Sequence, residues 1–386
     1  MLTSIRIRNF GSCQDVHISD ISPSLLFVGP NNAGKTTIMK AICWARDVAI
    51  KGGSTPVRPF FTQSSVELNF SLADEKYRYC ASALTKDISA PMTAPYYEEV
   101  LSIVREDEEE HLYTRSGEEL ISFFDGTEQI FSVQRLAGAL TFLSSISPES
   151  TPRLRSIESF LNGIRYFALD SISDDNGNWA VVSDHELQIW KAGGMPESEA
   201  GICMLKLVDL WLNDKDTFDE LVTLLGPDHL NVIQNIDIEI TETTQKRSRK
   251  DGTIDKRYYV YFDTEPGYAY YEDLSFGTRR ILHILIAMMY EENSVMLLEQ
   301  PEDGIHPGLL YRLTSTLLSY VEPMQLILTT HSPAVINEVG AQNIRIIQSI
   351  SGTTRAHALS GDELTRADEY VDATGQLADY IRLLED

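Results

Sequence analysis

The stretch that most constrains this chain is a glycine-rich loop followed by a lysine and two threonines. Residues 29–37 read GPNNAGKTT and match G-x-x-x-x-G-K-[ST], a loop whose backbone N–H groups cradle phosphates. The apolar run at 25–28 predicts a buried strand before the loop, and residues 37–42 predict the first turns of a helix after it. Strand, loop and helix in this order are the context that the pattern requires. The sequence therefore predicts a P-loop nucleotide site.

Each part of this loop has a use in phosphate binding. The glycines let the backbone approach a phosphate closely, and the helix N-terminus adds a dipole that favours negative charge. We expect Lys35 to neutralise the β- and γ-phosphates and the Thr36 hydroxyl to coordinate Mg²⁺. The residues predicted to contact the phosphates of a nucleotide are Gly29, Pro30, Asn31, Asn32, Ala33, Gly34, Lys35, Thr36 and Thr37.

Composition excludes several classes of protein. The chain has 386 residues, of which 43% are hydrophobic, so it can build a substantial core. It contains no apolar run long enough to span a bilayer, its N-terminus lacks the features of a signal peptide, and its four cysteines show no metal-ligand spacing. We expect a cytoplasmic protein. The net charge of −25 argues against a protein that coats nucleic acid.

The order of periodic patterns predicts four segments. Residues 1–135 carry the P-loop and strand patterns, beginning with a predicted edge strand at 3–10 and including a hairpin at 66–82. They predict a P-loop lobe with an antiparallel β-subdomain. Residues 136–265 predict a mainly helical insertion that ends in a β-hairpin. Residues 266–350 alternate helices with short apolar strands, and residues 351–386 form a polar tail with a terminal helix at 377–384.

Three further motifs lie in the third segment. Residues 274–280, LSFGTRR, begin a predicted helix with a serine and a glycine. Residues 295–302, VMLLEQPE, are an apolar strand that ends in Glu299, Gln300 and Glu302. Residues 328–332, LTTHS, end a second apolar strand with His331. Each motif alone is weak, but together with the P-loop they form a specific combination.

With these motifs the sequence resembles the ABC-type ATPases of the SMC, RecF and OLD class, which are also described as AAA-family ATPases. The resemblance covers residues 1–90 and 265–350. Within this class, the sequence is most similar in style to the single-chain ATPases of bacterial phage-defence and toxin-associated loci. It implies an α/β ABC-type P-loop ATPase head with an antiparallel β-subdomain and a helical insertion. OLD-type nucleases carry a nuclease domain after the histidine strand, and the stretch after 347 is short here. We therefore expect any nuclease activity to lie in a separate protein.

The resemblance also implies roles for individual residues. Ser275 and Gly277 would belong to the signature motif, which binds the γ-phosphate held by a second copy, so that ATP is sandwiched in a homodimer. Glu299 would hold Mg²⁺ together with Thr36, and His331 would act as the switch histidine. Gln134, which follows a predicted strand, fits the family glutamine that contacts ATP and Mg²⁺; Gln63 is its rival.

Position 300 departs from the family pattern. The family usually has a carboxylate there as the general base for water, whereas the Gln300 carboxamide cannot accept a proton usefully. Three explanations are open: the enzyme is naturally slow, Glu302 or His331 acts as the base, or the glutamine is a replacement introduced to trap ATP. We therefore expect Gln300, Glu302 and His331 to be the catalytic residues. We also expect the hydrolysis of ATP to be slow.

A basic stretch stands out in this acidic chain. It comprises Lys246, Arg247, Arg249 and Lys250, with Lys256 and Arg257 close by. It is either a solvated hairpin tip or a contact site for nucleic acid or an acidic partner.

The motifs and the resemblance together predict an ATP- and Mg²⁺-binding ATPase that dimerises. We expect it to switch a separate effector such as a nuclease or toxin, in phage defence. The alternative is a RecF- or SMC-like repair ATPase that clamps nucleic acid.

Overall fold

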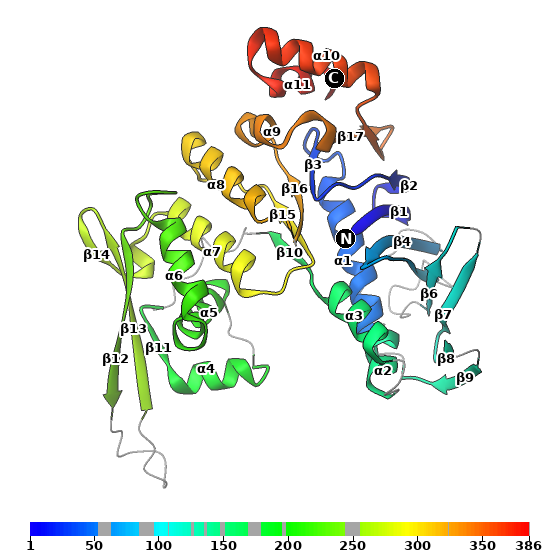
Figure 1. Cartoon of the computed structure of the whole chain (residues 1–386), viewed down its shortest axis with the longest axis horizontal. Helices are drawn as coiled ribbons and strands as arrows, with labels where there is room; N and C mark the ends of the chain where they lie inside the picture. The colour runs from blue at the N-terminus through cyan, green and yellow to red at the C-terminus, as the bar shows by residue number, and fades with distance from the viewer. Residues whose placement is uncertain are drawn as a thin grey trace. The chain divides into compact units, whose positions relative to one another are not determined.

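The computed structural model describes residues 1–52, 63–84, 96–106, 108–124, 127–134, 137–146, 151–168, 179–194, 198–243, 255–322 and 324–385 (Figure 1). The chain divides into two compact units. The first comprises Met1–Tyr166, Asn293–Pro301 and Leu317–Asp386. The second comprises Phe167–Glu292 and Glu302–Thr316. The two larger sheets belong mainly to the first unit.

An antiparallel sheet forms one part of the first unit. Its eight described strands lie in the order β2-β1-β4-β5-β6-β7-β8-β9. Apolar and polar residues alternate along them, so that Val66, Leu68 and Phe70 all face the core. The bounds are β1 (Leu2–Phe10), β2 (Cys13–Ile18), β4 (Gln63–Leu72), β5 (Glu75–Leu84), β6 (Tyr96–Val104), β7 (Glu109–Ser116), β8 (Glu119–Phe124) and β9 (Thr127–Ser132).

A second, mainly parallel sheet carries the P-loop. Its order is β10-β15-β16-β3-β17-β18, and β15, β16, β3 and β17 run parallel. These strands are nearly continuous apolar runs because both faces of the sheet are covered. Their carboxyl ends meet at one edge, where ligands bind in open α/β sheets. The bounds are β3 (Ser24–Val28), β10 (Ile164–Ala168), β15 (Val295–Glu299), β16 (Gln325–Thr329), β17 (Ile344–Ile350) and β18 (Thr353–Ala358).

The P-loop helix α1 (Lys35–Lys51) is the central helix of the first unit. Nine of its side chains are buried, among them Ile38, Ile42 and Trp44, in the same core as the antiparallel sheet. The other helices of this unit are α2 (Ala139–Ile146), α3 (Thr151–Asn162), α9 (Pro333–Val339), α10 (Gly361–Thr374) and α11 (Leu377–Glu385).

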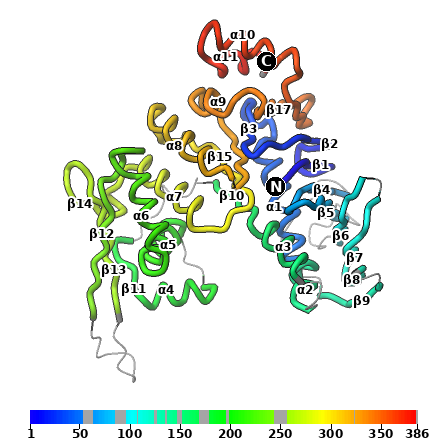
Figure 2. Tube along the Cα trace, in the orientation of Figure 1, coloured from blue at the N-terminus to red at the C-terminus, as the bar shows by residue number. Residues whose placement is uncertain are grey.

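The second unit combines helices with a small antiparallel sheet. Strands β12 (Asn235–Thr243) and β13 (Asp255–Thr264) pair over their whole length, and the tube in Figure 2 follows them side by side. Strands β11 (Val181–Ser183) and β14 (Gly267–Ala269) both pair with β13. The helices are α4 (Asp184–Lys191), α5 (Glu199–Asn213), α6 (Lys215–Leu225), α7 (Phe276–Tyr290) and most of α8 (Pro307–Ser319).

The predicted fold class is confirmed, since the chain combines a P-loop sheet, an antiparallel sheet and inserted helices. The prediction that 3–10 is an edge strand is wrong, because β1 lies between β2 and β4 and the edge strand is β2. The sequence patterns did not predict β10, β18, α4, α9 or α10. The segment boundaries at 135, 265 and 350 stay predictions. Within the described part of the chain, no helix has the length and apolar character that crossing a bilayer requires.

Candidate nucleotide-binding site

The P-loop has the backbone conformation that its residues favour. Gly34 caps the start of α1 with φ at 108°, and Asn32 adopts the left-handed region with φ at 65°, which asparagine tolerates better than most residues. Gly29 has φ at 153°, and a Cβ placed on it would lie 1.9 Å from the Ile347 carbonyl oxygen. The loop therefore needs glycine at position 29 because its backbone packs directly against β17.

Side chains that the sequence analysis missed support the loop from behind. The buried Thr354 hydroxyl on β18 donates to the Ala33 carbonyl at 2.8 Å and lies 2.7 Å from the Ser12 hydroxyl. A Cβ on Gly34 would come within 2.1 Å of this Thr354 oxygen. The hydroxyl thus holds the turn that directs α1, and no local pattern marks a strand threonine for such a role.

Lys35 brings the P-loop and the predicted switch histidine together. Its side chain is 7% exposed, and its Nζ donates to the carbonyl oxygens of Gly29 at 2.6 Å and Pro30 at 3.1 Å. The same Nζ lies 3.1 Å from His331 Nε2. The ammonium has no lone pair, so this hydrogen bond requires that the ring nitrogen accepts, which is the neutral imidazole tautomer with its proton on Nδ1. The parallel pairing of β16 with β3 places the two segments side by side.

Thr36 and Glu299 form the pair predicted to hold a metal ion. The Thr36 hydroxyl donates to Glu299 Oε1, and the Tyr166 hydroxyl of β10 donates to Glu299 Oε2. Tyr166 was not anticipated, since β10 itself was not. A hydroxyl and a carboxylate are hard oxygen ligands that suit Mg²⁺, which is usually held by one or two carboxylates together with substrate phosphates. Among the described residues, no group of three or more His, Cys, Asp or Glu side chains could hold a metal by itself. These residues therefore fit an ATP–Mg²⁺ site.

Gln300 directly follows β15 in a strained backbone conformation. Its φ is 44°, a left-handed value that costs a non-glycine residue about 1–2 kcal/mol. Its N–H donates to the Thr329 carbonyl at 3.0 Å, which holds it at the carboxyl edge of the sheet beside β16. Glu302, the rival catalytic carboxylate, belongs to the second unit, because the division falls after Pro301.

The predicted signature residues lie at the start of α7 in the second unit. Ser275 is exposed and caps the helix, accepting a hydrogen bond from the Thr278 N–H at 3.1 Å. A Cβ on Gly277 would lie 2.6 Å from the Gly304 carbonyl oxygen, so this glycine permits close packing of two backbone segments. The structure thus gives Ser275 a capping role, which is compatible with an additional contact from its exposed surface.

The remaining predicted residues are two glutamines beside strands of the antiparallel sheet and the basic stretch. Gln134 follows β9, its side chain is exposed, and its carbonyl accepts a hydrogen bond from Arg115 Nη2 at 3.3 Å. Gln63 is exposed at the start of β4. The structure describes no contact of either glutamine with the P-loop. Lys246, Arg247, Arg249 and Lys250 lie outside the described residues.

Two family models match separate parts of this chain. Residues 208–337 match the family described as "AAA domain, putative AbiEii toxin, Type IV TA system", and residues 4–132 match one described as "AAA domain". The chain is 30% identical over 130 residues to the uncharacterized protein MJECL44 of Methanocaldococcus jannaschii, covering 33% of this chain and 36% of that protein. It is 22% identical over 382 residues to the Old nuclease of Escherichia phage P2, covering 93% of this chain and 61% of that protein.

The fold is similar to that of a solved SMC head. The structure titled "Crystal structure of the SmcHead bound to the C-winged helix domain of ScpA" superposes with a TM-score of 0.52 at 11% identity, covering 94% of this chain and 99% of that one. The chain spans only 36% of the length of MJECL44 and 61% of the length of the Old nuclease. ATPases of these families bind ATP, typically with Mg²⁺. Its two AAA-domain matches, its weak similarity to the Old nuclease and its SMC-head-like fold support a resemblance of the chain to ATPases of the SMC, RecF and OLD type.

Proposed function

We propose that this protein binds ATP with Mg²⁺, hydrolyses it slowly, and dimerises around the nucleotide. The observation that carries the proposal is the meeting of three chain segments at one sheet edge. Lys35 contacts His331 there, and Thr36 contacts Glu299, so a lysine, a histidine, a hydroxyl and a carboxylate converge. This combination suits a triphosphate with its metal ion better than any other ligand class.

The chain's own groups have separate tasks in this proposal. The N–H groups at the start of α1 would bind phosphate oxygens, and Lys35 would turn from the loop carbonyls to the phosphates. Thr36 and Glu299 would hold Mg²⁺, which when bound neutralises charge on the phosphate oxygens. Tyr166, which donates to the second oxygen of Glu299, would orient that carboxylate.

Water activation is the step in which the proposed site departs from the pattern that the family resemblance implies. Gln300 can orient a water molecule by hydrogen bonding but cannot remove its proton. The one accepting nitrogen of the neutral His331 ring, Nε2, contacts Lys35, so it could accept a proton only after Lys35 turns to the phosphates. The Glu302 carboxylate is the other proton acceptor in the proposal. Loss of general-base assistance typically costs about 10²–10⁴-fold in rate, so we propose slow turnover.

Dimerisation completes the proposed site. The exposed N-terminus of α7 offers Ser275 and a helix dipole to an anion. In the proposal it binds the γ-phosphate held by the P-loop of a second copy, so ATP joins the two chains and hydrolysis releases them. This cycle would switch a separate effector such as a nuclease or toxin, with phage defence as the proposed setting.

A second candidate function is a RecF- or SMC-like repair ATPase that clamps nucleic acid. The SMC-head-like fold and the basic stretch at 246–257 favour it. The overall charge of −25 works against broad contact with a phosphate backbone. We therefore rank it second, and binding to nucleic acid at varied salt concentrations separates the two candidates.

The dimer is tested by light scattering coupled to size-exclusion chromatography, with and without ATP–Mg²⁺. The unchanged chain is expected to shift from monomer to dimer with ATP, whereas Lys35→Ala and Ser275→Arg should weaken the shift. Ser198→Arg, at the N-cap of α5 in the same unit, is the matched control and should behave like the unchanged chain. If the molecular mass is the same with and without ATP, and the same in both substituted chains, the sandwiched dimer is contradicted.

A further inference from the structure

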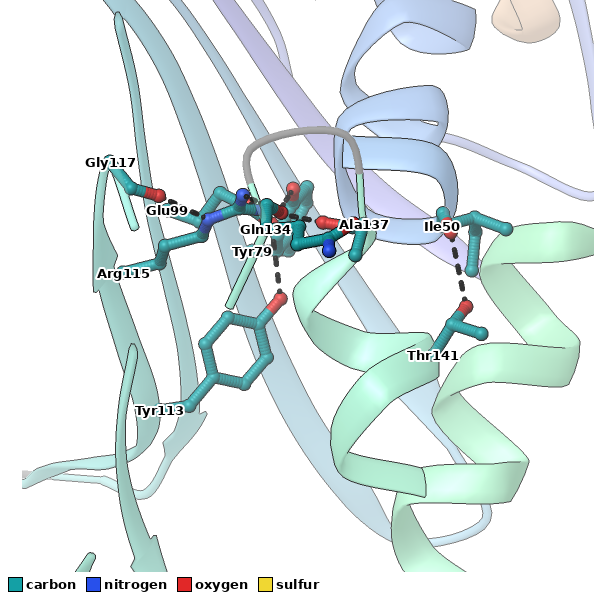
Figure 3. Close-up of polar contacts among 9 residues, drawn as sticks. All are labelled: Ile50, Tyr79, Glu99, Tyr113, Arg115, Gly117, Gln134, Ala137 and Thr141. Carbon is teal, nitrogen blue, oxygen red and sulfur yellow. Dashed lines mark hydrogen bonds and ion pairs between the residues drawn. The ribbon is translucent and has the colours of Figure 1, made fainter. Parts of the chain in front are cut away.

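A buried ion pair lies within the antiparallel sheet, far along the chain from the nucleotide motifs (Figure 3). Glu99 on β6 and Arg115 on β7 are 0% and 2% exposed, and Arg115 Nη1 lies 3.0 Å from Glu99 Oε1. A buried ion pair contributes little net stability on average, because desolvating both charges offsets their attraction. The pair therefore matters more for the backbone groups that the guanidinium holds in place than for its own contribution to stability.

The surroundings of Glu99 fix the orientation of this pair. Its second oxygen, Oε2, accepts hydrogen bonds from the hydroxyls of Tyr79 at 2.8 Å and Tyr113 at 3.4 Å. Burial raises the pKa of Glu99, and the Arg115 charge and the two phenols oppose that shift. With both of its oxygens engaged, the carboxylate is a rigid support for the guanidinium.

Arg115 uses its remaining donors to hold the segment that follows β9. Its Nε donates to the Gly117 carbonyl at 2.8 Å, within its own strand turn. Its Nη1 also donates to the Ala137 carbonyl at 2.8 Å, and its Nη2 donates to the Gln134 carbonyl at 3.3 Å. Figure 3 shows the guanidinium reaching from the sheet toward these two carbonyls. The guanidinium thereby ties this segment to the sheet.

The same segment packs against the C-terminal end of the P-loop helix. A Cβ on Gly138 would lie 2.1 Å from the Ile50 carbonyl oxygen, and one on Gly52 would lie 2.3 Å from the Ala137 carbonyl oxygen. The Thr141 hydroxyl donates to the Ile50 carbonyl at 3.2 Å, which satisfies an acceptor in the last turn of the helix. The residues that Arg115 holds are thus in direct contact with the end of α1.

We propose that Arg115, supported by Glu99, is a positioning residue for the nucleotide site. A chain of contacts links the antiparallel sheet to the end of α1, and a helix of 17 residues transmits a tilt at one end to the other. The N-terminal end of α1 carries Lys35 and Thr36. This inference rests on the ATPase function proposed above and adds the antiparallel sheet as the element that sets the orientation of the P-loop helix.

The geometry predicts which kinetic quantity depends on Arg115. Nucleotide contacts made by the P-loop backbone move together with α1, so ATP affinity should survive a small tilt. The pairs Lys35–His331 and Thr36–Glu299 join α1 to other strands, so a tilt disturbs their alignment. A misplacement of about 1 Å can cost up to about 10²-fold in turnover. Loss of the Arg115 hydrogen bonds to the Gln134 and Ala137 carbonyls should therefore lower kcat and leave nucleotide affinity nearly unchanged.

The experiment compares Arg115→Lys, Arg115→Met and Glu99→Gln with the unchanged chain. Single-turnover hydrolysis of radiolabelled ATP, anisotropy with a fluorescent ATP analogue, and the melting temperature are measured on each. Leu112→Ala is the matched control, because it removes a buried side chain from the same strand without removing any bond of Arg115. Thr141→Val, at an exposed position, breaks the link to α1 without disturbing the buried pair and remains informative if the Arg115 variants fail to fold.

The expected result is that the Arg115 and Thr141 variants lower the hydrolysis rate about tenfold or more, with affinity changed less than about threefold. Leu112→Ala should lower the melting temperature while keeping the rate. The loss in the Arg115→Lys, Thr141→Val double variant should be smaller than the product of the two single losses, because both act through one link. A normal rate in Thr141→Val and in folded Arg115 variants, or equal losses in Leu112→Ala, overturns the proposal. If the unchanged chain neither binds nor hydrolyses ATP, the ATPase proposal fails with it.

Discussion

Lys35 Nζ lies 3.1 Å from His331 Nε2, although 296 positions separate the two residues in the sequence. Lys35 begins the P-loop helix, and His331 follows the neighbouring strand β16. The contact joins the group that would bind phosphate to a group that can accept a proton. In the proposed function, Lys35 acts on nucleotide binding and His331 acts on turnover.

Replacing these two residues should therefore affect different quantities. Lys35→Ala should abolish binding of a fluorescent ATP analogue, because the phosphates lose their cation. His331→Ala should retain binding and lower single-turnover hydrolysis by about 10²–10⁴-fold, the usual contribution of a positioned acid or base. His357→Ala, on the antiparallel strand β18, is the control and should change neither. Equal losses of binding in both site variants would contradict the separation of roles.

The second prediction concerns the base. Gln300→Glu should raise the single-turnover rate, because it supplies a carboxylate at the edge where Gln300 is held. If Glu302 is the base, Gln300→Glu should do little and Glu302→Gln should remove the remaining activity. Radiolabelled ATP and rapid quenching decide between these outcomes. A fast rate in the unchanged chain that survives both Glu302→Gln and His331→Ala would show that the catalytic strand is wrongly assigned.

The third prediction tests the unexpected tyrosine. Tyr166→Phe removes the hydroxyl that donates to Glu299 Oε2 and leaves the ring in place. Loss of such an outer hydrogen bond typically weakens metal binding about 10–100-fold, so the Mg²⁺ concentration for half-maximal hydrolysis should rise by that order. Tyr258→Phe, which removes a similar bond to Asp184 in the second unit, serves as the control. An unchanged Mg²⁺ requirement would mean that Tyr166 has no part in metal binding.

The fourth prediction concerns the support behind the loop. Thr354→Val preserves the shape of the side chain but leaves the buried Ala33 carbonyl without this donor. An unsatisfied buried acceptor costs about 1–3 kcal/mol, which should appear in the free energy of unfolding measured by urea titration. ATP–Mg²⁺ should then stabilise the variant less than it stabilises the unchanged chain. Thr353→Val, at the adjacent strand position, should lower the free energy of unfolding less. It should also keep more of the stabilisation by ATP–Mg²⁺.

The fifth prediction addresses the basic stretch. If Arg247, Arg249 and Lys250 meet nucleic acid, changing all three to alanine should reduce the salt dependence of binding to a short duplex, because fewer counterions are released. Fluorescence anisotropy between low and physiological salt measures this slope. Equal slopes, or no binding at any salt concentration, would assign these residues to a solvated hairpin tip.

Local patterns were sufficient wherever a few neighbouring residues carry the signal. The glycines, lysine and threonine of the P-loop, with an apolar strand before them, predicted β3, the loop and α1. Continuous apolar runs predicted β15 and β16, since strands buried on both faces have no polar face to alternate with. Strict alternation predicted the pairing of β4 with β5 and of β12 with β13. The helices α9 and α10 were missed because one is short and the other is mostly polar.

The sequence by itself determined the P-loop and the apolar strands beside it, because these depend on residues a few positions apart. The same local residues carry the proposed class of ligand. Only the tertiary structure placed Tyr166 on Glu299, Thr354 behind Ala33, and Arg115 on the Ala137 carbonyl. Tyr166 lies 133 positions from its partner and Thr354 lies 321 positions from its own. Strand order brings such residues together, and no local periodicity encodes the order in which distant strands pair.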